Sequence, residues 1–143
     1  MLLIATGLFI IVTRRMENTK RMPQLTISDK VTISVDIEDT DEKRALGYSG
    51  HKPITFSEGK LFVFSVPGNY LFWMKDMLFD LDFIYIRKNK IVDLKENIPS
   101  PQNNKGEIAY VNATVPFDSV LEVKSGFVKK YGVRVGNSVK VSP

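Results

Sequence analysis

Residues 61–86 constrain the fold more than any other part of the chain. They read LFVFSVPGNYLFWMKDMLFDLDFIYI and include the only Trp and five of the nine Phe residues. Strands with one solvated face alternate polar and apolar residues, so strands within so apolar a run are expected to be buried on both faces. Four charged residues interrupt the run, namely Lys75, Asp76, Asp80 and Asp82. We expect these charges at strand ends or facing a pocket.

Length and charge limit the class of protein. The chain has 143 residues, which suits a single domain with one core. Its net charge is +4, but four basic residues and one acid precede Pro23, and the remainder carries sixteen Lys and Arg against fifteen Asp and Glu. A nucleic-acid-binding domain concentrates its positive charge on the folded body. We therefore predict no nucleic-acid partner.

The numbers of Cys and His residues limit which catalytic and metal-binding sites the chain can form. The chain has no Cys and one His, His51. Disulfides, thiolate nucleophiles and Cys-ligated metal centres are thereby excluded, and so is a metal site with several His ligands. The sequence contains no phosphate-binding loop and no recognisable pair of a nucleophile and its base. It therefore predicts no metal and no cofactor.

The N-terminal segment predicts membrane targeting. Residues 2–12 form an uncharged apolar run, which as a helix would cover less than ~20 Å of a ~30 Å hydrocarbon core. This length suits the hydrophobic region of a signal peptide or a shortened anchor. Thr13-Arg14-Arg15 follows in place of a small-residue cleavage site. We expect an uncleaved anchor whose true start lies upstream of Met1, or a secreted protein if the segment is cleaved.

The expected domain boundary follows from this segment. We predict a hydrophobic targeting or anchor segment with its linker at residues 1–24 and a single globular domain at residues 25–143. The alternative for residues 2–12 is a buried core helix, but the polar, Pro-containing linker at residues 16–24 argues against it. The basic residues after the run would keep the body cytoplasmic by the positive-inside rule, whereas a basic region upstream of Met1 would reverse that orientation.

The body predicts many short strands and few helices. Residues 30–38 alternate apolar and polar side chains, as in a half-buried strand. Residues 39–47 predict a short helix that is capped by Asp39 or Thr40 and ended by Gly47. Further strands are expected at residues 61–64, 70–75, 81–86, 91–96, 108–114 and 119–124, with a strand pair around Gly136-Asn137 at residues 133–141. A second helix, capped by Ser125, is expected at residues 126–131. The predicted fold is α+β: a small, mostly-β, barrel-like sheet of about seven short strands with two short helices.

Five sequence blocks carry a family resemblance. They are DTDEKRALG at residues 39–47, GKLFVF at 59–64, FWMK at 72–75, LDFIYI at 81–86 and VLEV at 120–123, followed by Gly126 and Gly136. In this order and spacing they resemble family 192 of the domains of unknown function, an uncharacterised group of bacterial and archaeal proteins. The resemblance covers residues 31–141, and FWMK is its most specific part. It implies a small, mostly-β domain, often behind a signal peptide or anchor, and no agreed activity. It therefore favours a membrane-anchored, extracytoplasmic body.

The chain departs from the family pattern in three places. The family usually has Asn-Thr after the Lys of FWMK, where this chain has Asp76-Met77. It usually has Pro two residues before the Asp of the next block, where this chain has Asp80. A Cys-containing loop of many members is free of Cys here, at residues 98–106. Sites that use those family positions are not carried over to this protein.

Asp82 is the charge that most needs an explanation. By strand parity it shares an apolar face with Ile84 and Ile86. A buried carboxylate must be hydrogen-bonded or paired, because an isolated buried charge costs several kcal/mol. In the structural interpretation, loop amides donate to Asp82, and Lys75 or Arg44 closes an ion pair.

The functional interpretation places Trp73, Lys75, Asp82 and Glu122 around one pocket. Trp73 would form an apolar wall, Lys75 would hold an anionic or hydroxyl-rich ligand, and the two carboxylates would accept hydrogen bonds. We expect a non-catalytic module that binds a small ligand, a glycan or a protein partner. The alternative is a hydrolase or lyase with Asp82 and Glu122 as an acid–base pair and Lys75 stabilising charge, since carboxylates ~5–10 Å apart suit glycoside chemistry. An intracellular nucleic-acid binder is the third possibility.

Overall fold

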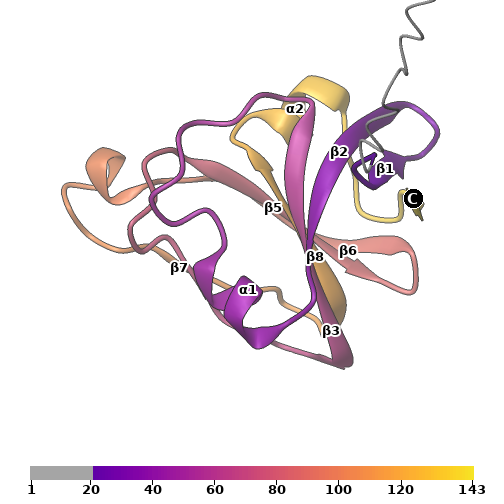
Figure 1. The fold of residues 1–143 in the computed structure, drawn as a ribbon, viewed down its shortest axis with the longest axis horizontal. Helices are drawn as coiled ribbons and strands as arrows, with labels where there is room; N and C mark the ends of the chain where they lie inside the picture. Colours follow the sequence, from indigo (N-terminus) through magenta and orange to yellow (C-terminus); the bar gives the residue numbers. More distant parts are fainter. Residues whose placement is uncertain (1–20) are drawn as a thin grey trace, which may run out of the picture.

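A seven-stranded sheet in the order β6-β5-β8-β3-β2-β1-β9 forms the framework of the protein (Figure 1). The computed structural model describes residues 21–143, so the predicted anchor at residues 2–12 lies outside the described residues. Within residues 21–143, no helix is long and apolar enough to cross a bilayer. The strands are β1 (Gln24–Ile27), β2 (Val31–Glu38), β3 (Glu58–Gly68), β4 (Phe72–Trp73), β5 (Leu81–Arg87), β6 (Lys90–Ile98), β7 (Tyr110–Val111), β8 (Phe117–Lys124) and β9 (Val139–Ser142). The helices are α1 (Asp41–Leu46), the 3₁₀ helix η1 (Pro101–Asn103) and α2 (Phe127–Tyr131).

One strand pair breaks the antiparallel pattern of the sheet. β2 and β3 run parallel, with Ile37 opposite Leu61, whereas all other neighbours in this sheet are antiparallel. Parallel neighbours need a long crossover connection, and α1 with the loop after it supplies one. Thr40 caps α1 by accepting a hydrogen bond from the Lys43 N–H. The crossover covers part of one face of the sheet.

The two edges of the sheet approach each other. Lys90 at the start of β6 forms a bridge with Ser138, just before β9. The Ile91 N–H donates to the Asn137 carbonyl at 3.0 Å, and the Gly136 N–H donates to the Ile91 carbonyl at 2.8 Å. The sheet is therefore a curled half-barrel, which together with the two short helices confirms the predicted α+β, barrel-like fold.

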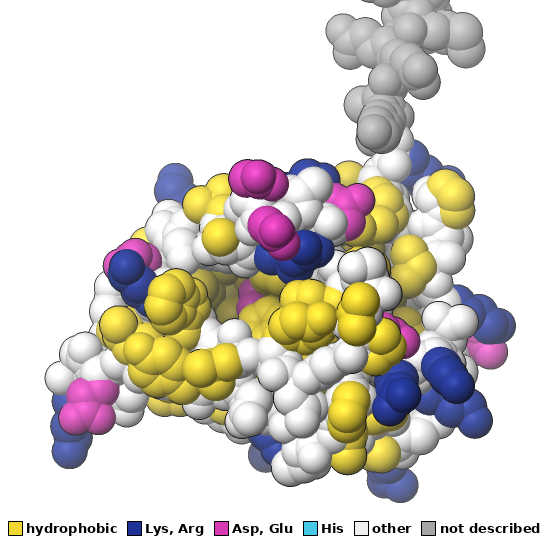
Figure 2. Space-filling view, turned by 90° about the horizontal axis from the view of Figure 1, so that it is seen from below, with side chains coloured by type: hydrophobic (Ala, Val, Ile, Leu, Met, Phe, Trp, Pro, Cys, Tyr) yellow, Lys and Arg dark blue, Asp and Glu magenta, His cyan; other side chains and the backbone are white. Residues whose placement is uncertain are grey.

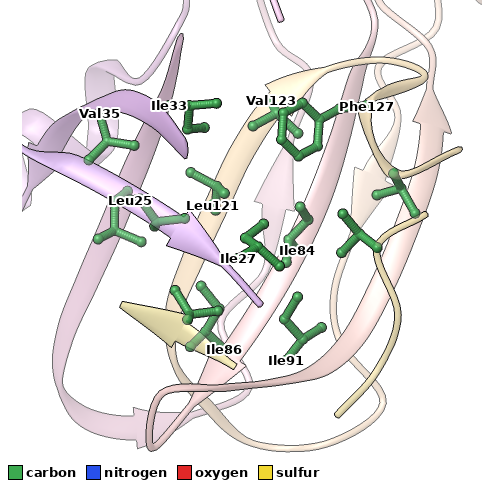
Figure 3. Packing of buried hydrophobic residues seen from close by; sticks show 14 residues of the cluster. Leu25, Ile27, Ile33, Val35, Ile84, Ile86, Ile91, Leu121, Val123 and Phe127 are labelled. Carbon is green, nitrogen blue, oxygen red and sulfur yellow. The ribbon is translucent and has the colours of Figure 1, made fainter. Parts of the chain in front are cut away.

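The interior of the curled sheet holds one hydrophobic cluster (Figure 3). Alternate residues of β1, β2, β5 and β8 point into it, and α2 adds side chains from one end. Its buried members are Leu25, Ile27, Ile33, Val35, Leu61, Ile84, Ile86, Ile91, Leu121, Val123, Phe127, Val128, Val133 and Val139. The period-two pattern of β2 thus gives the buried face that the sequence predicted.

A second hydrophobic cluster covers the outer face of the same sheet. Its buried members are Tyr48, Ile54, Phe62, Met74, Met77, Phe79, Leu81, Phe83, Tyr85, Val111, Ala113, Phe117 and Val120. Phe83 and Tyr85 belong to this cluster, whereas Ile84 and Ile86 belong to the interior. β5 is therefore buried on both faces, as its apolar run predicted.

The strand predicted at residues 70–75 is reduced to the two residues of β4. β4 pairs with β7, with Phe72 opposite Val111, in a separate two-stranded ribbon over the outer face. Leu71 and Trp73 are 65% and 52% exposed. The expectation that the whole run is buried on both faces is wrong here, because the ribbon covers the sheet with one face and meets solvent with the other.

The C-terminal part also differs from expectation. The strand pair predicted at residues 133–141 is a single strand, β9, which pairs with β1. The predicted Ser125 cap of α2 does not form, because the Ser125 hydroxyl donates to the Asn97 side chain at 2.7 Å. Gly126 occupies the N-cap position with a φ of 88°, and a carboxylate from the strand β5 takes over the capping role, as described below.

Candidate functional site

A cavity of about 310 Å³ opens on the outer face of the sheet, between the α1 crossover and the segment around β4. Figure 2 shows this face, with a hollow that is bounded by hydrophobic side chains and an acidic side chain visible inside it. The cavity is lined by Arg44, Ala45, Leu46, Gly47, Tyr48, Ser49, Phe62, Phe64, Tyr70, Leu71, Phe72, Trp73, Met77 and Glu122. Of these lining residues, all within the described part of the chain, Glu122 alone is acidic.

Arg44 holds the first wall of the cavity in place. Its Nη1 donates to the Val63 carbonyl at 2.7 Å, and its Nη2 donates to Asp41 Oδ1 at 2.6 Å. Its guanidinium carbon lies 5.1 Å from the centre of the Phe64 ring. These contacts tie α1 to β3. The crossover then brings the buried Tyr48 ring onto the outer face of the sheet.

The segment after β3 forms the second wall. Tyr70 stacks on Phe64 with ring centres 4.0 Å apart. Phe72 lies edge-to-face against Phe62 at 5.4 Å, whereas its neighbour Trp73 is half exposed at the rim. Alternation along β4 therefore gives one aromatic ring to the wall and one to the rim.

Glu122 of β8 lies at the base of the cavity. It is opposite Lys60 of β3 and Phe83 of β5 in the sheet register, and it is 5% exposed. Burial raises the pKa of its carboxyl group from the usual value to about 8; the charge of Lys60 opposes this rise and that of Glu38 adds to it. Within residues 21–143, no hydrogen bond and no ion pair reaches this carboxyl group. Glu122 is therefore mostly protonated and unpartnered at neutral pH.

Lys60, which lies opposite Glu122 in the sheet, forms ion pairs with two other carboxylates. Its Nζ lies 2.5 Å from Glu38 Oε1 and 3.6 Å from Asp36 Oδ2, and 5.1 Å from the centre of the Tyr48 ring. Burial, with a further contribution from the nearby acids, raises the pKa of the Tyr48 hydroxyl and keeps it neutral. Lys60 thus pairs with two carboxylates, those of the buried Glu38 and the exposed Asp36, and lies opposite Glu122 in the sheet register.

Comparison with known proteins identifies the family. The sequence profile of DUF192 (“Uncharacterized ACR”) matches residues 24–141. The chain belongs to this family. The matched segment runs from β1 to β9, and the match confirms the resemblance to family 192 of the domains of unknown function. No curated protein matches the chain.

Two solved structures share the fold of this DUF192 domain. A protein of unknown function from Novosphingobium aromaticivorans DSM 12444 has a TM-score of 0.74 at 20% identity, over 82% of this chain and 83% of the other. A Sinorhizobium meliloti 1021 protein described as a “putative transcription regulator” has a TM-score of 0.71 at 24% identity, over 83% of this chain and 91% of the other. At such low identities these likenesses establish the fold alone.

Two of the four site residues predicted for this DUF192 domain line the cavity. Glu122 forms its base, and Trp73 lies at its rim, with its ring centre 6.5 Å from that of Tyr110 in β7. Lys75 is not among the lining residues. Its Nζ lies 5.6 Å from the centre of the Trp73 ring, so it borders the rim from the solvent side.

Asp82 lies in the interior of the curled sheet and is fully buried. Its Oδ1 accepts a hydrogen bond from the Asn97 N–H at 2.8 Å, and its Oδ2 accepts one from the Val128 N–H at 2.9 Å. Val128 is in the first turn of α2, so Asp82 caps this helix and fixes the end of β6. The ion pair expected with Lys75 or Arg44 does not form in the described part of the chain. The structural interpretation, in which backbone amides donate to Asp82, therefore accounts for this residue.

Asp82 and Glu122 lie on opposite faces of the sheet. The register of β5 and β8 pairs Asp82 with Val123 and Phe83 with Glu122. Because successive side chains of a strand point to opposite faces, the two carboxyl groups face different sides. The acid–base pair of the alternative hydrolase is therefore not assembled by this geometry.

Lys60 and Glu38 are site residues that were not predicted from the sequence. Lys60 shares a strand face with Phe62, so a charge on an apolar face was visible in the pattern, as it was for Asp82. Glu38 looked like part of the solvated face of β2. It is buried because the α1 crossover folds over it, and nothing in the alternation of β2 indicates that cover.

Proposed function

We propose that this DUF192 domain is a non-catalytic module that binds a small ligand with an apolar body and one hydrogen-bonding group. The observation that carries the proposal is the unpartnered Glu122 carboxyl group at the base of an open, aromatic cavity. The Glu122 oxygens are not among the fully buried side-chain atoms that lack a partner in residues 21–143, so they remain accessible from the cavity. A ligand that enters the cavity can therefore bond to Glu122.

The shape and lining of the cavity also support a small ligand. Its volume of about 310 Å³ lies at the lower end of the range of roughly 300–1,000 Å³ that is typical of small-molecule sites. Such sites combine apolar walls with a few polar groups that orient the ligand. Binding of a protein partner or a long glycan would cover the rim, but only a group that enters the cavity reaches Glu122.

Binding accounts for the site more simply than catalysis. Acid–base hydrolysis needs a second carboxyl group or a nucleophile beside the first. Asp82 is bonded to amides on the other face of the sheet. Within residues 21–143 there is also no group of three or more His, Cys, Asp or Glu side chains arranged to hold a metal ion.

Trp73 provides a direct assay, because it is the only Trp in the sequence and lies at the rim of the cavity. Titration of the full chain with a library of small aromatic and aliphatic alcohols, amines and amides should identify compounds that change the Trp73 fluorescence and raise the melting temperature. Saturable binding by at least one chemical series supports the proposal. A library without any such series contradicts it.

Two matched variants on α1 locate the binding. Ala45→Phe adds a ring at a residue that lines the cavity, whereas Glu42→Phe adds the same ring on the same helix at a residue that does not line it. Both residues are exposed, so both variants should fold. We expect Ala45→Phe to weaken binding about tenfold or more and Glu42→Phe to leave it unchanged. Equal effects of the two variants would place the ligand elsewhere.

The location of the domain is part of the proposal. The apolar run at residues 2–12 supports a membrane-anchored, extracytoplasmic body. Expression in a bacterial host with a C-terminal reporter that is active only outside the cytoplasm tests this orientation. Activity of the reporter in the membrane fraction is the expected result, and a soluble, inactive fusion would contradict it.

A further inference from the structure

We propose that the ligand of this cavity is an organic ammonium compound, whose cationic group lies against Glu122 while its apolar body packs on the aromatic walls. This inference rests on the proposed binding function and adds the chemical class of the ligand. It follows from the charges around the base of the cavity, from the aromatic lining and from the absence of a partner for Glu122 in the described part of the chain.

The buried cluster at the base lacks a second cation. Glu38 and Glu122 contribute two buried carboxyl groups and Lys60 contributes one buried ammonium group, whereas the Asp36 side chain is 58% exposed. Lys60 forms ion pairs with Glu38 and Asp36 and not with Glu122. An ammonium group from a ligand would give Glu122 the charged partner that the described residues do not provide.

The cations of the surrounding elements are already engaged. Arg44 lines the cavity from α1, but it bonds to Asp41 and to a backbone carbonyl of β3. Lys124, two residues after Glu122 on β8, lies 5.1 Å from the centre of the Phe56 ring, outside the cavity lining.

The remaining neighbours of Glu122 are uncharged. β5 presents Phe83 and Tyr85 on this face, and the crossover presents Tyr48. Burial raises the pKa of both tyrosine hydroxyls, so neither contributes a charge near neutral pH.

The aromatic lining suits a cation as well as an apolar body. Phe62, Phe64, Tyr70, Phe72 and Trp73 all line the cavity. Aromatic rings attract ammonium groups through their electron-rich faces, and more strongly where the site is desolvated. Lys60 already makes such a contact with Tyr48. An anionic ligand would gain no such attraction from the rings, and it would require Glu122 to stay protonated beside it.

Binding of a cation should displace the proton of Glu122. Because burial raises the pKa of this group to about 8, Glu122 carries a proton at pH 7 in the free protein. A positive charge beside it favours the ionised form, so an ammonium ligand should release up to about one proton per molecule bound. A neutral alcohol of the same shape would bond to the protonated carboxyl group and release none.

The test compares matched pairs of probes with the full chain at pH 7. Benzylamine, phenethylamine and 3-phenylpropylamine are paired with the corresponding alcohols, and calorimetry in buffers of different ionisation enthalpy counts the protons released. We expect the best amine to bind about tenfold more tightly than its alcohol, which corresponds to ~1.4 kcal/mol, and to release protons. Alcohols that bind as tightly as the amines, or amines that bind without proton release, would overturn the ammonium assignment and leave the binding function standing.

Glu122→Gln provides the matched variant. The amide keeps the size of the side chain but cannot ionise, so amine affinity should fall about tenfold and proton release should vanish, while alcohol affinity stays within about twofold. Unchanged amine affinity in this variant would overturn the proposal. If no probe of either series binds, the ammonium assignment fails, and the broader library titration then decides separately whether the cavity binds any ligand.

Discussion

Asp82 and Glu122 are buried carboxyl groups on neighbouring strands of one sheet, but their surroundings differ completely. Asp82 lies in the interior, is fully buried and accepts hydrogen bonds from two backbone amides. Glu122 lies on the outer face beneath an open cavity and has no hydrogen-bond partner among residues 21–143. The first carboxylate is part of the framework, whereas the second remains available for a partner from outside the chain.

The difference between the two faces follows from how each is covered. The interior is enclosed by the curl of the sheet and by α2, whose first turn Asp82 caps. The outer face is covered mainly by the α1 crossover and by the β4–β7 ribbon with the loop after β4. These two segments meet incompletely, and the cavity lies where they leave the sheet open. The Glu122 carboxyl group therefore lies on the side that a ligand can reach.

The largest expected effect is the loss of the Asp82 carboxylate. Asp82→Ala removes an ionised acceptor and leaves the Asn97 and Val128 amides without a partner. Hydrogen bonds to a charged group contribute ~1.5–3 kcal/mol each, so we expect the free energy of unfolding to fall by about 4 kcal/mol. Urea denaturation of the variant and the parent protein measures this loss.

Asp82→Asn is the control for this prediction. The amide oxygen can still accept one of the two hydrogen bonds, whereas its NH₂ group faces the other amide. The loss should therefore be intermediate between those of the parent and Asp82→Ala. An unchanged melting temperature in Asp82→Ala would mean that Asp82 does not stabilise the fold. Asp82 would then be a candidate functional residue, as Glu122 is.

The interior face of the sheet, and the need of Asp82 for a partner, could be predicted from the sequence. Alternation along residues 30–38 and 81–86 places the apolar residues on their faces, and the same parity marks Asp82 as a charge that needs a partner. Its partners could not be predicted, because they belong to segments that the register of β5, β6 and α2 brings together. Parity within one strand carries no information on the register between strands.

The burial of residues on the outer face was harder to predict, because it also depends on contacts between distant segments. Glu122 was a candidate from its strand, but its burial depends on the crossover and the ribbon that fold over it. Trp73 illustrates the same limit: residues 70–75 look like a buried strand, yet only Phe72 and Trp73 form β4, and one of these two rings faces solvent. Which face of a covering segment is solvated depends on tertiary packing rather than on local pattern.

The second prediction concerns the pH dependence of stability. The pKa of Glu122 in the folded protein is raised to about 8, so the folded state holds this proton more tightly than the unfolded state does. Glu122 therefore contributes a stability that is fully present below its unfolded pKa near 4.5 and is lost as the pH rises through about 8. We expect unfolding free energies at pH 9 to be roughly 3–4 kcal/mol lower than at pH 5 from this group.

Glu122→Gln isolates this contribution. The amide is neutral at every pH, so the fall in stability between pH 5 and pH 9 should be smaller in the variant by that amount. Chemical denaturation at several pH values measures both curves. Parallel curves for the parent protein and the variant would mean that Glu122 is solvated or paired, and the comparison with Asp82 would then lose its basis.

The smallest expected effect on stability is that of Trp73→Ala. Truncation of a buried Trp costs ~3–5 kcal/mol, but Trp73 is 52% exposed at the rim of the cavity, so we expect a loss below about 1 kcal/mol. Phe72→Ala is the matched control, because its ring packs against Phe62 and Phe83 and its loss should cost about 3 kcal/mol. Urea denaturation of both variants shows which of the two rings is packed in the cavity wall and which lies at the exposed rim. Equal losses would mean that Trp73 belongs to the core of the outer face, whereas a small loss combined with weaker ligand binding marks it as part of the binding surface.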